Sequence, residues 1–254
     1  MATKYAQNNG NWSDDIAQNT WFDAQSGGNA VDHPVEGDKA IINAGVTITI
    51  DDSADATIIV GPDSGDAIDV KGILQYLHTA AVDHVLRCKG NLKTTAGGSL
   101  KIGTAANPIP AARTFTIELN YSASLSEGKY GLLNYGEMIL QGDPARITVK
   151  DCLLNADAAA NATSLTTDVA TGWKDNDDIA IASTTRTWSE AENGKMNGDA
   201  IGTALTVDGF GGAGGGLAYA HSGISPTQAE IINLSRNVKV TSYNTSYRGY
   251  VCCY

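Results

Sequence analysis

Basic residues are scarce in this sequence, and they form no dense run. The 254 residues include 17 Lys and Arg against 28 Asp and Glu, which gives a formal net charge of −11. A nucleic-acid-binding protein needs a dense basic face to displace counterions, and an anionic membrane surface attracts the same kind of face. The charge balance therefore argues against a nucleic-acid partner and against docking on an anionic membrane.

Long apolar runs are missing as well. No stretch reaches the ~18 apolar residues that a membrane-spanning helix needs. The N-terminal stretch MATKYAQNNGNWSDD has no apolar segment of the kind found in a signal peptide. We therefore expect no membrane insertion and no signal peptide in this chain.

Cysteine is also rare. Cys88 and Cys152 lie in alternating apolar segments and are predicted to be core residues, whereas Cys252 and Cys253 are adjacent near Tyr254. No CxxC motif and no Cys/His pair has the spacing of a zinc site. We therefore expect neither a structural metal nor a cofactor.

The sequence is rich in glycine and in short segments of alternating polarity. The segments are rich in β-branched residues, alternate apolar with polar positions and are separated by turn residues, which predicts an all-β protein. The clearest lie at 46–50, 68–70, 100–102, 115–119, 147–149 and 238–240. Helical spacing of apolar residues at 74–86 leaves one helix there as the alternative to two strands.

A glycine followed by a strand recurs along the chain, at Gly45, Gly72, Gly98 and Gly136. The first three are 27 and 26 residues apart, and the last gap of 38 leaves room for an inserted loop. Periods of this length are typical of stacked solenoids. We therefore favour a right-handed parallel β-helix over a β-sandwich, which stays the alternative.

Five ordered blocks of the chain resemble a known family, the G-eight (eight-glycine) domain. They lie at 34–51, 97–104, 135–142, 173–184 and 229–238. The family includes cell-surface hyaluronan depolymerases and fibrocystin, and the resemblance implies a β-helix-like fold in an extracellular or surface polysaccharide setting. One position departs from the pattern, because residue 177 is Asp where the family has glycine.

The resemblance divides the chain into two parts. Residues 31–254 are predicted to form the G-eight-like β-helix domain, and residues 1–30 an N-terminal cap or attachment segment. Solenoid ends need such caps because a terminal coil exposes unpaired sheet edges. Within this cap, Ser13 is a candidate N-cap for a short helix over 14–18.

Two motifs suggest ligand sites but lack the required context. Residues 209–214 spell G-x-G-x-x-G, yet more glycine follows where a dinucleotide site needs a helix, which predicts a flexible surface loop. Asp175, Asp177 and Asp178 form an acidic group, but the Gly and Glu that a calcium-binding EF-hand loop requires are absent. The better interpretation of this group is a turn before a strand.

Candidate catalytic and binding residues cluster late in the chain. If residues 190–192 form a strand, Glu190 and Glu192 share one face and resemble the carboxylate pair of a glycosidase. The better interpretation of the segment 188–198 is a polar loop. Trp188, Tyr219 and His221 are candidate carbohydrate-binding residues, through stacking and hydrogen bonding. We assign no catalytic residue, so enzymatic activity stays open, with a non-enzymatic role favoured.

The C-terminal segment is rich in aromatic residues. Tyr and Arg are enriched at interface centres, so Tyr247, Arg248, Tyr250 and Tyr254 are candidate interface residues. The favoured function is a non-enzymatic structural or host-recognition component of a phage-like particle, in a tail, a spike or the capsid. The alternative is a carbohydrate-binding module or a hyaluronidase-like surface protein that degrades polysaccharide. The expected partners are other copies of the chain, neighbouring particle proteins or a surface glycan, in a virion or at an extracellular surface.

Overall fold

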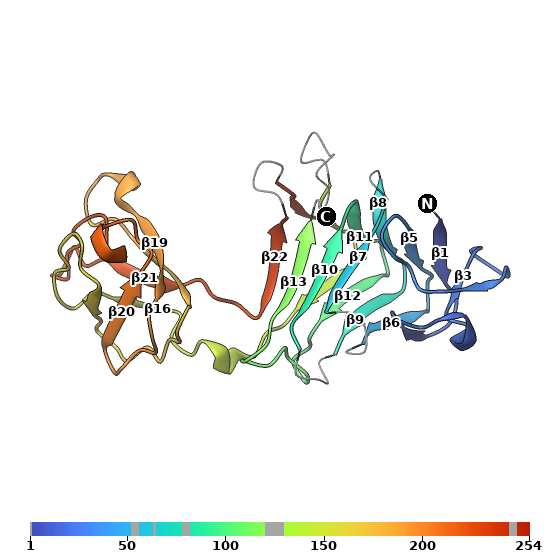
Figure 1. Ribbon diagram of the computed structural model, residues 1–254, viewed down its shortest axis with the longest axis horizontal. Helices are drawn as coiled ribbons and strands as arrows, with labels where there is room; N and C mark the ends of the chain where they lie inside the picture. Colours follow the sequence, from blue (N-terminus) through green and yellow to red (C-terminus); the bar gives the residue numbers. More distant parts are fainter. Residues whose placement is uncertain (1, 52–55, 63–64, 78–81, 120–129, 244–247) are drawn as a thin grey trace. The chain divides into compact units, whose positions relative to one another are not determined.

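A computed structural model describes residues 2–51, 56–62, 65–77, 82–119, 130–243 and 248–254 (Figure 1). The chain divides into two compact units, residues 1–143 with 236–254, and residues 144–235. Both units are built from β-strands, and the helices of the described residues are short 3₁₀ turns. None of the described helices is long and apolar enough to span a membrane.

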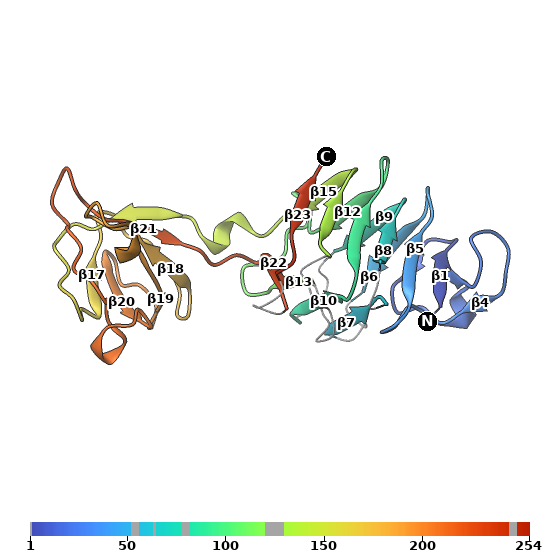
Figure 2. The ribbon, with the colours of Figure 1, turned by 90° about the horizontal axis from the view of Figure 1, so that it is seen from above.

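The first unit contains three sheets of parallel strands, which the chain visits in turn (Figures 1 and 2). The first sheet holds β1 (Thr3–Ala6), β5 (Lys39–Ile42), β8 (Asp66–Val70), β11 (Asn91–Thr94), β14 (Leu132–Asn134) and β23 (Val251–Cys253). The second holds β2 (Gly10–Asn11), β6 (Thr47–Ile50), β9 (Ile73–Tyr76), β12 (Ser99–Ile102) and β15 (Glu137–Leu140). The third holds β7 (Thr57–Val60), β10 (His84–Cys88), β13 (Phe115–Leu119) and β22 (Val238–Ser242). The prediction of parallel strands is confirmed for the first unit.

The inward-facing side chains of the strands form the core of this unit. Ile48 pairs in register with Leu74, and Leu74 with Leu100, so aliphatic side chains stack from one coil to the next. All three are fully buried, and each contributes ~1.5–3 kcal/mol relative to an exposed position. The apolar residues of the alternating segments at 46–50, 68–70 and 100–102 are buried: Val46, Ile48, Ile50, Ile68, Val70, Leu100 and Ile102.

The recurring glycines lie at the corner between the first and second sheets. A Cβ atom on Gly72, Gly98 or Gly136 would lie 2.2 Å from a backbone carbonyl oxygen of the preceding coil. The backbones approach too closely there for any side chain, which is why the glycine repeats with the coil. Gly45 serves a different need, since its φ of +80° favours glycine for conformational reasons.

Residues 2–30 contribute to the same sheets. β1 and β2 extend two of them in parallel, and β3 (Trp21–Phe22) and β4 (Ala30–Val31) continue the first sheet in antiparallel fashion. The buried rings of Trp12 and Trp21 pack edge to face, with their centroids 5.4 Å apart. Ser13 is not the predicted cap, because its hydroxyl donates to Asp51 and Asp15 caps the turn η1 (Ile16–Gln18) instead.

Two other local predictions are resolved by the structure. The 74–86 stretch, apart from residues 78–81, which lie outside the described part, belongs to β9 and β10 and not to a helix. Residues 147–149 are not a strand. They follow the 3₁₀ turn η2 (Pro144–Arg146), and the carbonyl of Val149 accepts the indole N–H of Trp173 at 2.7 Å, so pairing begins only at Asp151.

The second unit is a six-stranded antiparallel sheet with its own core. Its strands are β16 (Asp151–Leu153), β17 (Ser164–Thr166), β18 (Asp178–Ile181), β19 (Glu192–Met196), β20 (Ala204–Asp208) and β21 (Glu230–Asn233), in the order β16-β21-β18-β19-β20-β17. The expectation of one parallel β-helix over 31–254 does not hold for residues 144–235. Alternation along a strand is the same for parallel and antiparallel pairing, so the sequence pattern carried no signal for this difference.

Candidate functional site

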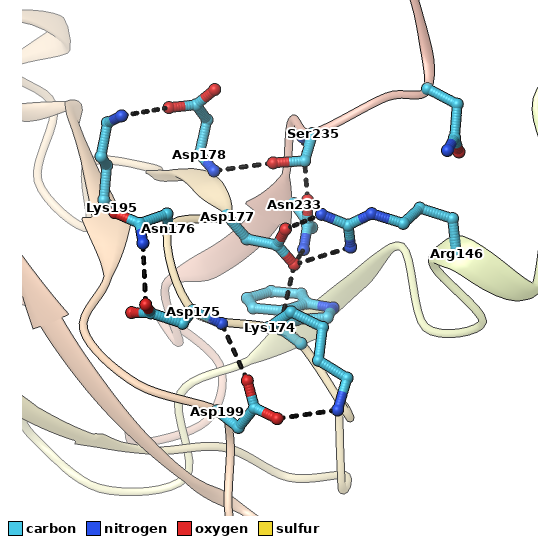
Figure 3. Close-up of polar contacts among 12 residues, drawn as sticks. Arg146, Lys174, Asp175, Asn176, Asp177, Asp178, Lys195, Asp199, Asn233 and Ser235 are labelled. Carbon is cyan, nitrogen blue, oxygen red and sulfur yellow. Dashed lines mark hydrogen bonds and ion pairs between the residues drawn. The ribbon is translucent and has the colours of Figure 1, made fainter. Parts of the chain in front are cut away.

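A tight turn before β18 organises the polar groups of the second unit (Figure 3). The N–H of Asp177 donates to the carbonyl of Lys174 at 3.1 Å, and Asn176 adopts a left-handed φ of +62°, which Asn tolerates better than most residues. The turn directs the Asp177 side chain inward, where it is fully buried. The position that departs from the family pattern therefore lies at the centre of this polar cluster.

The Asp177 carboxylate connects segments that are distant in the sequence. It accepts hydrogen bonds from both terminal nitrogens of Arg146, from the N–H of Lys174 at 2.9 Å and from Nδ2 of Asn233 at 2.8 Å. Burial raises the pKa of this carboxyl, but the hydrogen bonds and the Arg146 charge outweigh burial and hold the pKa below its ordinary value. We call this group the Asp177 clasp: Arg146 precedes the first strand of the unit, and Asn233 ends the last.

The neighbouring carboxylates point to separate partners. Asp175 accepts from the N–H of Gly198 and from Asn176 Nδ2, both at 2.7 Å. Asp178 lies 3.7 Å from Lys195 Nζ, and its N–H donates to Ser235. In the part of the chain that the structure describes, no three His, Cys, Asp or Glu side chains are arranged to hold a metal ion.

A second buried polar pair lies where β19 begins. Glu192 Oε1 is 2.7 Å from His221 Nε2, and both residues are buried. The same carboxylate accepts the N–H groups of Ala218 and Tyr219 at 2.7 and 3.2 Å. His221 Nδ1 lies 3.1 Å from the carbonyl oxygen of Ala182, which only accepts, so Nδ1 is the donor.

The candidate glycosidase pair is not formed. Glu190 belongs to the 3₁₀ turn η3 (Trp188–Glu190) and accepts from the Thr185 hydroxyl at 2.5 Å, whereas β19 begins at Glu192. The two carboxylates therefore do not share one face of a strand. Glu192 is also fully engaged by His221 and two backbone amides.

The three predicted carbohydrate-binding residues differ in exposure. Trp188 is 87% exposed and Tyr219 is 43% exposed, but His221 is only 2% exposed. The structure brings Tyr219 and His221 together through Glu192, which contacts both. Trp188 lies four positions before this carboxylate, on the adjoining turn.

The predicted interface residues follow β22. Tyr254 is 76% exposed, and its ring stacks on Tyr135 at 4.5 Å with an interplanar angle of 3°. Tyr250 is 39% exposed, Arg248 is exposed, and Tyr247 lies outside the described residues. The described members are therefore exposed to solvent.

The glycine-rich segment does not form a dinucleotide site. It leads into a three-residue 3₁₀ turn, η4 (Ala213–Gly215), which is too short to serve as the helix of that motif. Phe210 is buried, and its N–H donates to the carbonyl of Gly215 at 3.1 Å. The loop that we expected to be flexible is therefore fastened at Phe210.

The two buried clusters had little signal in the sequence. Arg146 and Asn233 lie 31 and 56 residues from Asp177, and His221 lies 29 residues from Glu192. Contacts over such separations depend on strand order, which the local pattern does not encode. The one available signal was Asp177, which stands where the G-eight pattern has glycine.

Comparison with known proteins gives one relationship. Over 225 residues the chain is 29% identical to Fibrocystin-L from Mus musculus, and the match covers 82% of this chain but 5% of that protein. No family model matches the sequence, and no solved structure matches. The similarity is therefore to one part of a much longer protein.

Proposed function

We propose that this chain is a non-enzymatic structural or recognition component of a larger surface assembly. The proposal rests on one observation, which is that the buried ionisable groups of the second unit bond to other parts of the chain. Asp177 and the Glu192–His221 pair are buried and bonded to other parts of the chain, so they hold segments together and present no reactive group to a substrate. The aromatic side chain of Trp188, by contrast, faces solvent.

The scaffold we propose is a right-handed parallel β-helix of the G-eight type. The chain passes through three sheets in a fixed order and returns to each in parallel register, for example from β5 to β8 and from β8 to β11. Connections between parallel strands of one sheet are right-handed in nearly all proteins, which supports this hand. The similarity to Fibrocystin-L supports the G-eight relationship.

The assembly we propose is a phage-like particle, in which the chain contacts copies of itself or neighbouring proteins. The stacked pair Tyr135–Tyr254, together with Tyr250, supplies exposed aromatic surface on the first unit. Rigid aromatic side chains contribute large contact area at low entropic cost, which suits an interface. Self-association predicts a molar mass above that of one chain in solution.

Two measurements test this function. Light scattering should give a multimeric mass that falls in the double variant Tyr250→Ser/Tyr254→Ser but not in the control Tyr219→Ser. Hyaluronan incubated with the chain should keep its length, because a net charge of −11 repels a polyanion. Shortening of hyaluronan that Glu192→Gln abolishes would show an enzyme and overturn the proposal, and a monomer at every concentration would refute self-association.

A second function, carbohydrate binding without turnover, is favoured by the exposure of Trp188. Indole rings are apolar, and leaving one 87% exposed gives up most of the burial energy it offers. The same chain buries its other three tryptophans, Trp12, Trp21 and Trp173.

A further inference from the structure

We infer that the two loops tied together by Glu192 and His221 form a binding surface for a neutral glycan, with the Trp188 ring as its stacking platform. This inference rests on the proposed recognition function and names its ligand class. We call the surface the Trp188 platform, and define it as residues 183–190 with residues 218–224.

The platform is built on a buried polar base. His221 bonds to the Ala182 carbonyl and to Glu192, at the two ends of the first loop. The N–H of Ser222 also donates to the Thr184 hydroxyl at 3.1 Å. Contacts at both ends and within the loop fix it relative to the second loop, which reduces the conformational entropy that ligand binding would cost.

Hydrogen bonds within the first loop hold Trp188 outward. The N–H of Glu190 donates to the Thr187 carbonyl at 3.1 Å, and that of Ala191 to the Trp188 carbonyl at 3.2 Å. The Thr185 hydroxyl donates to the Glu190 carboxylate, which braces the turn from the side. A turn organised in this way presents the indole to solvent as a defined feature of the fold.

The surroundings of Trp188 suit a sugar better than an apolar protein partner. The flanking loop residues Thr185, Thr187 and Ser189 are exposed and carry hydroxyls. The other exposed apolar residues of the platform, Tyr219 and Ile224, lie on its second loop. A protein-docking patch is normally a contiguous apolar area of several hundred Å². A sugar ring instead combines an apolar face, which stacks on an aromatic ring, with hydroxyls that bond to polar neighbours.

The charge of the second unit selects for neutral glycans. Residues 144–235 carry 11 Asp and Glu against 5 Lys and Arg. This field repels uronic-acid and sulfated polymers and leaves a neutral sugar unaffected. His221 is too deeply buried to contact the ligand, so its role is to hold the second loop in place.

Fluorescence quenching tests this inference directly. Trp188 is exposed while Trp12, Trp21 and Trp173 are at most 2% exposed, so acrylamide quenches mainly Trp188 in the folded chain. We expect at least one of three neutral probes, amylopectin, galactomannan and soluble β-glucan, to protect Trp188 from acrylamide. Hyaluronan, the acidic comparison, should give no protection.

Affinity electrophoresis in gels that contain the protecting polysaccharide then measures binding. Trp188→Ala should weaken binding by about tenfold or more, since loss of an aromatic anchor commonly removes over 1.4 kcal/mol. Ile201→Ala removes another exposed apolar side chain of the second unit, outside the platform, and should bind as the unchanged chain does. An unchanged circular dichroism spectrum shows that Trp188→Ala is folded.

Four results would overturn the inference. In the quenching test, these are no protection of Trp188 by any neutral probe, protection by hyaluronan alone, or shielding of Trp188 by self-association without glycan. In electrophoresis, it is equal binding by Trp188→Ala and the unchanged chain. Shielding by self-association would assign the platform to a protein partner. Such failures without polysaccharide cleavage leave the proposed non-enzymatic function standing, whereas cleavage overturns that function itself.

Discussion

Replacing Gly98 by alanine should strongly destabilise the first unit. The new Cβ would lie 2.2 Å from the carbonyl oxygen of Val70 and 3.2 Å from that of Thr95. Ordinary contact needs about 3.5 Å, so the coils must separate by roughly 1 Å at a corner where strands lie about 4.8 Å apart. That movement strains the bond from the Thr95 N–H to Val70, which is 2.9 Å long.

The expected cost is about 2–5 kcal/mol, from overpacking of about 1–3 kcal/mol and weakening of one or two hydrogen bonds at about 1 kcal/mol each. Urea unfolding followed by circular dichroism measures it, with a separate transition fitted for each unit. Gly97→Ala is the matched control: its Cβ meets nothing within 4 Å, but φ is +85°, so we expect a loss of only about 1–2 kcal/mol. Equal losses in the two variants would refute the close approach of the coils as the reason for the glycine repeat.

The remaining predictions concern the Asp177 clasp and the cysteines. Asp177→Asn leaves the Arg146 charge without its carboxylate and should cost the second unit about 2–4 kcal/mol in urea unfolding at pH 7. Because the folded pKa of Asp177 is lowered, its contribution is present above the unfolded value near 3.8 and is lost as pH falls through the folded value. The unchanged chain should therefore lose more stability than Asp177→Asn on acidification below about pH 4, and parallel losses would contradict the clasp. Iodoacetamide at pH 8 should modify exposed Cys253 first and spare Cys88 and Cys152, whose pKa burial raises to about 12. Mass spectrometry of peptides gives the order, and early labelling of Cys88 in the folded chain would contradict its burial.

Local requirements were predictable from the sequence, and long-range pairings were not. The glycine repeat was visible because each coil meets the same steric limit at the same corner, and the buried residues of β6 and β12 followed from alternation. The antiparallel unit was missed because alternation does not distinguish pairing direction. The segment 188–198 was predicted as a polar loop, and its polar composition hid the strand that starts at Glu192, just after the 3₁₀ turn that contains Glu190. The burial of His221 could not be anticipated, since its carboxylate partner is distant in sequence.

The Asp177 clasp also lowers the entropic cost of the insertion between β15 and β22. Roughly a hundred residues separate these strands, and closing a structureless loop of that length costs about 4 kcal/mol in chain entropy. Here β16 pairs with β21, and Asp177 joins Arg146 to Asn233, so the inserted segment closes on itself. The loop-closure entropy that the first unit must offset is then that of the few residues that flank the insertion. The insertion can change in length or sequence beyond the clasp with little entropic effect on the stacked strands.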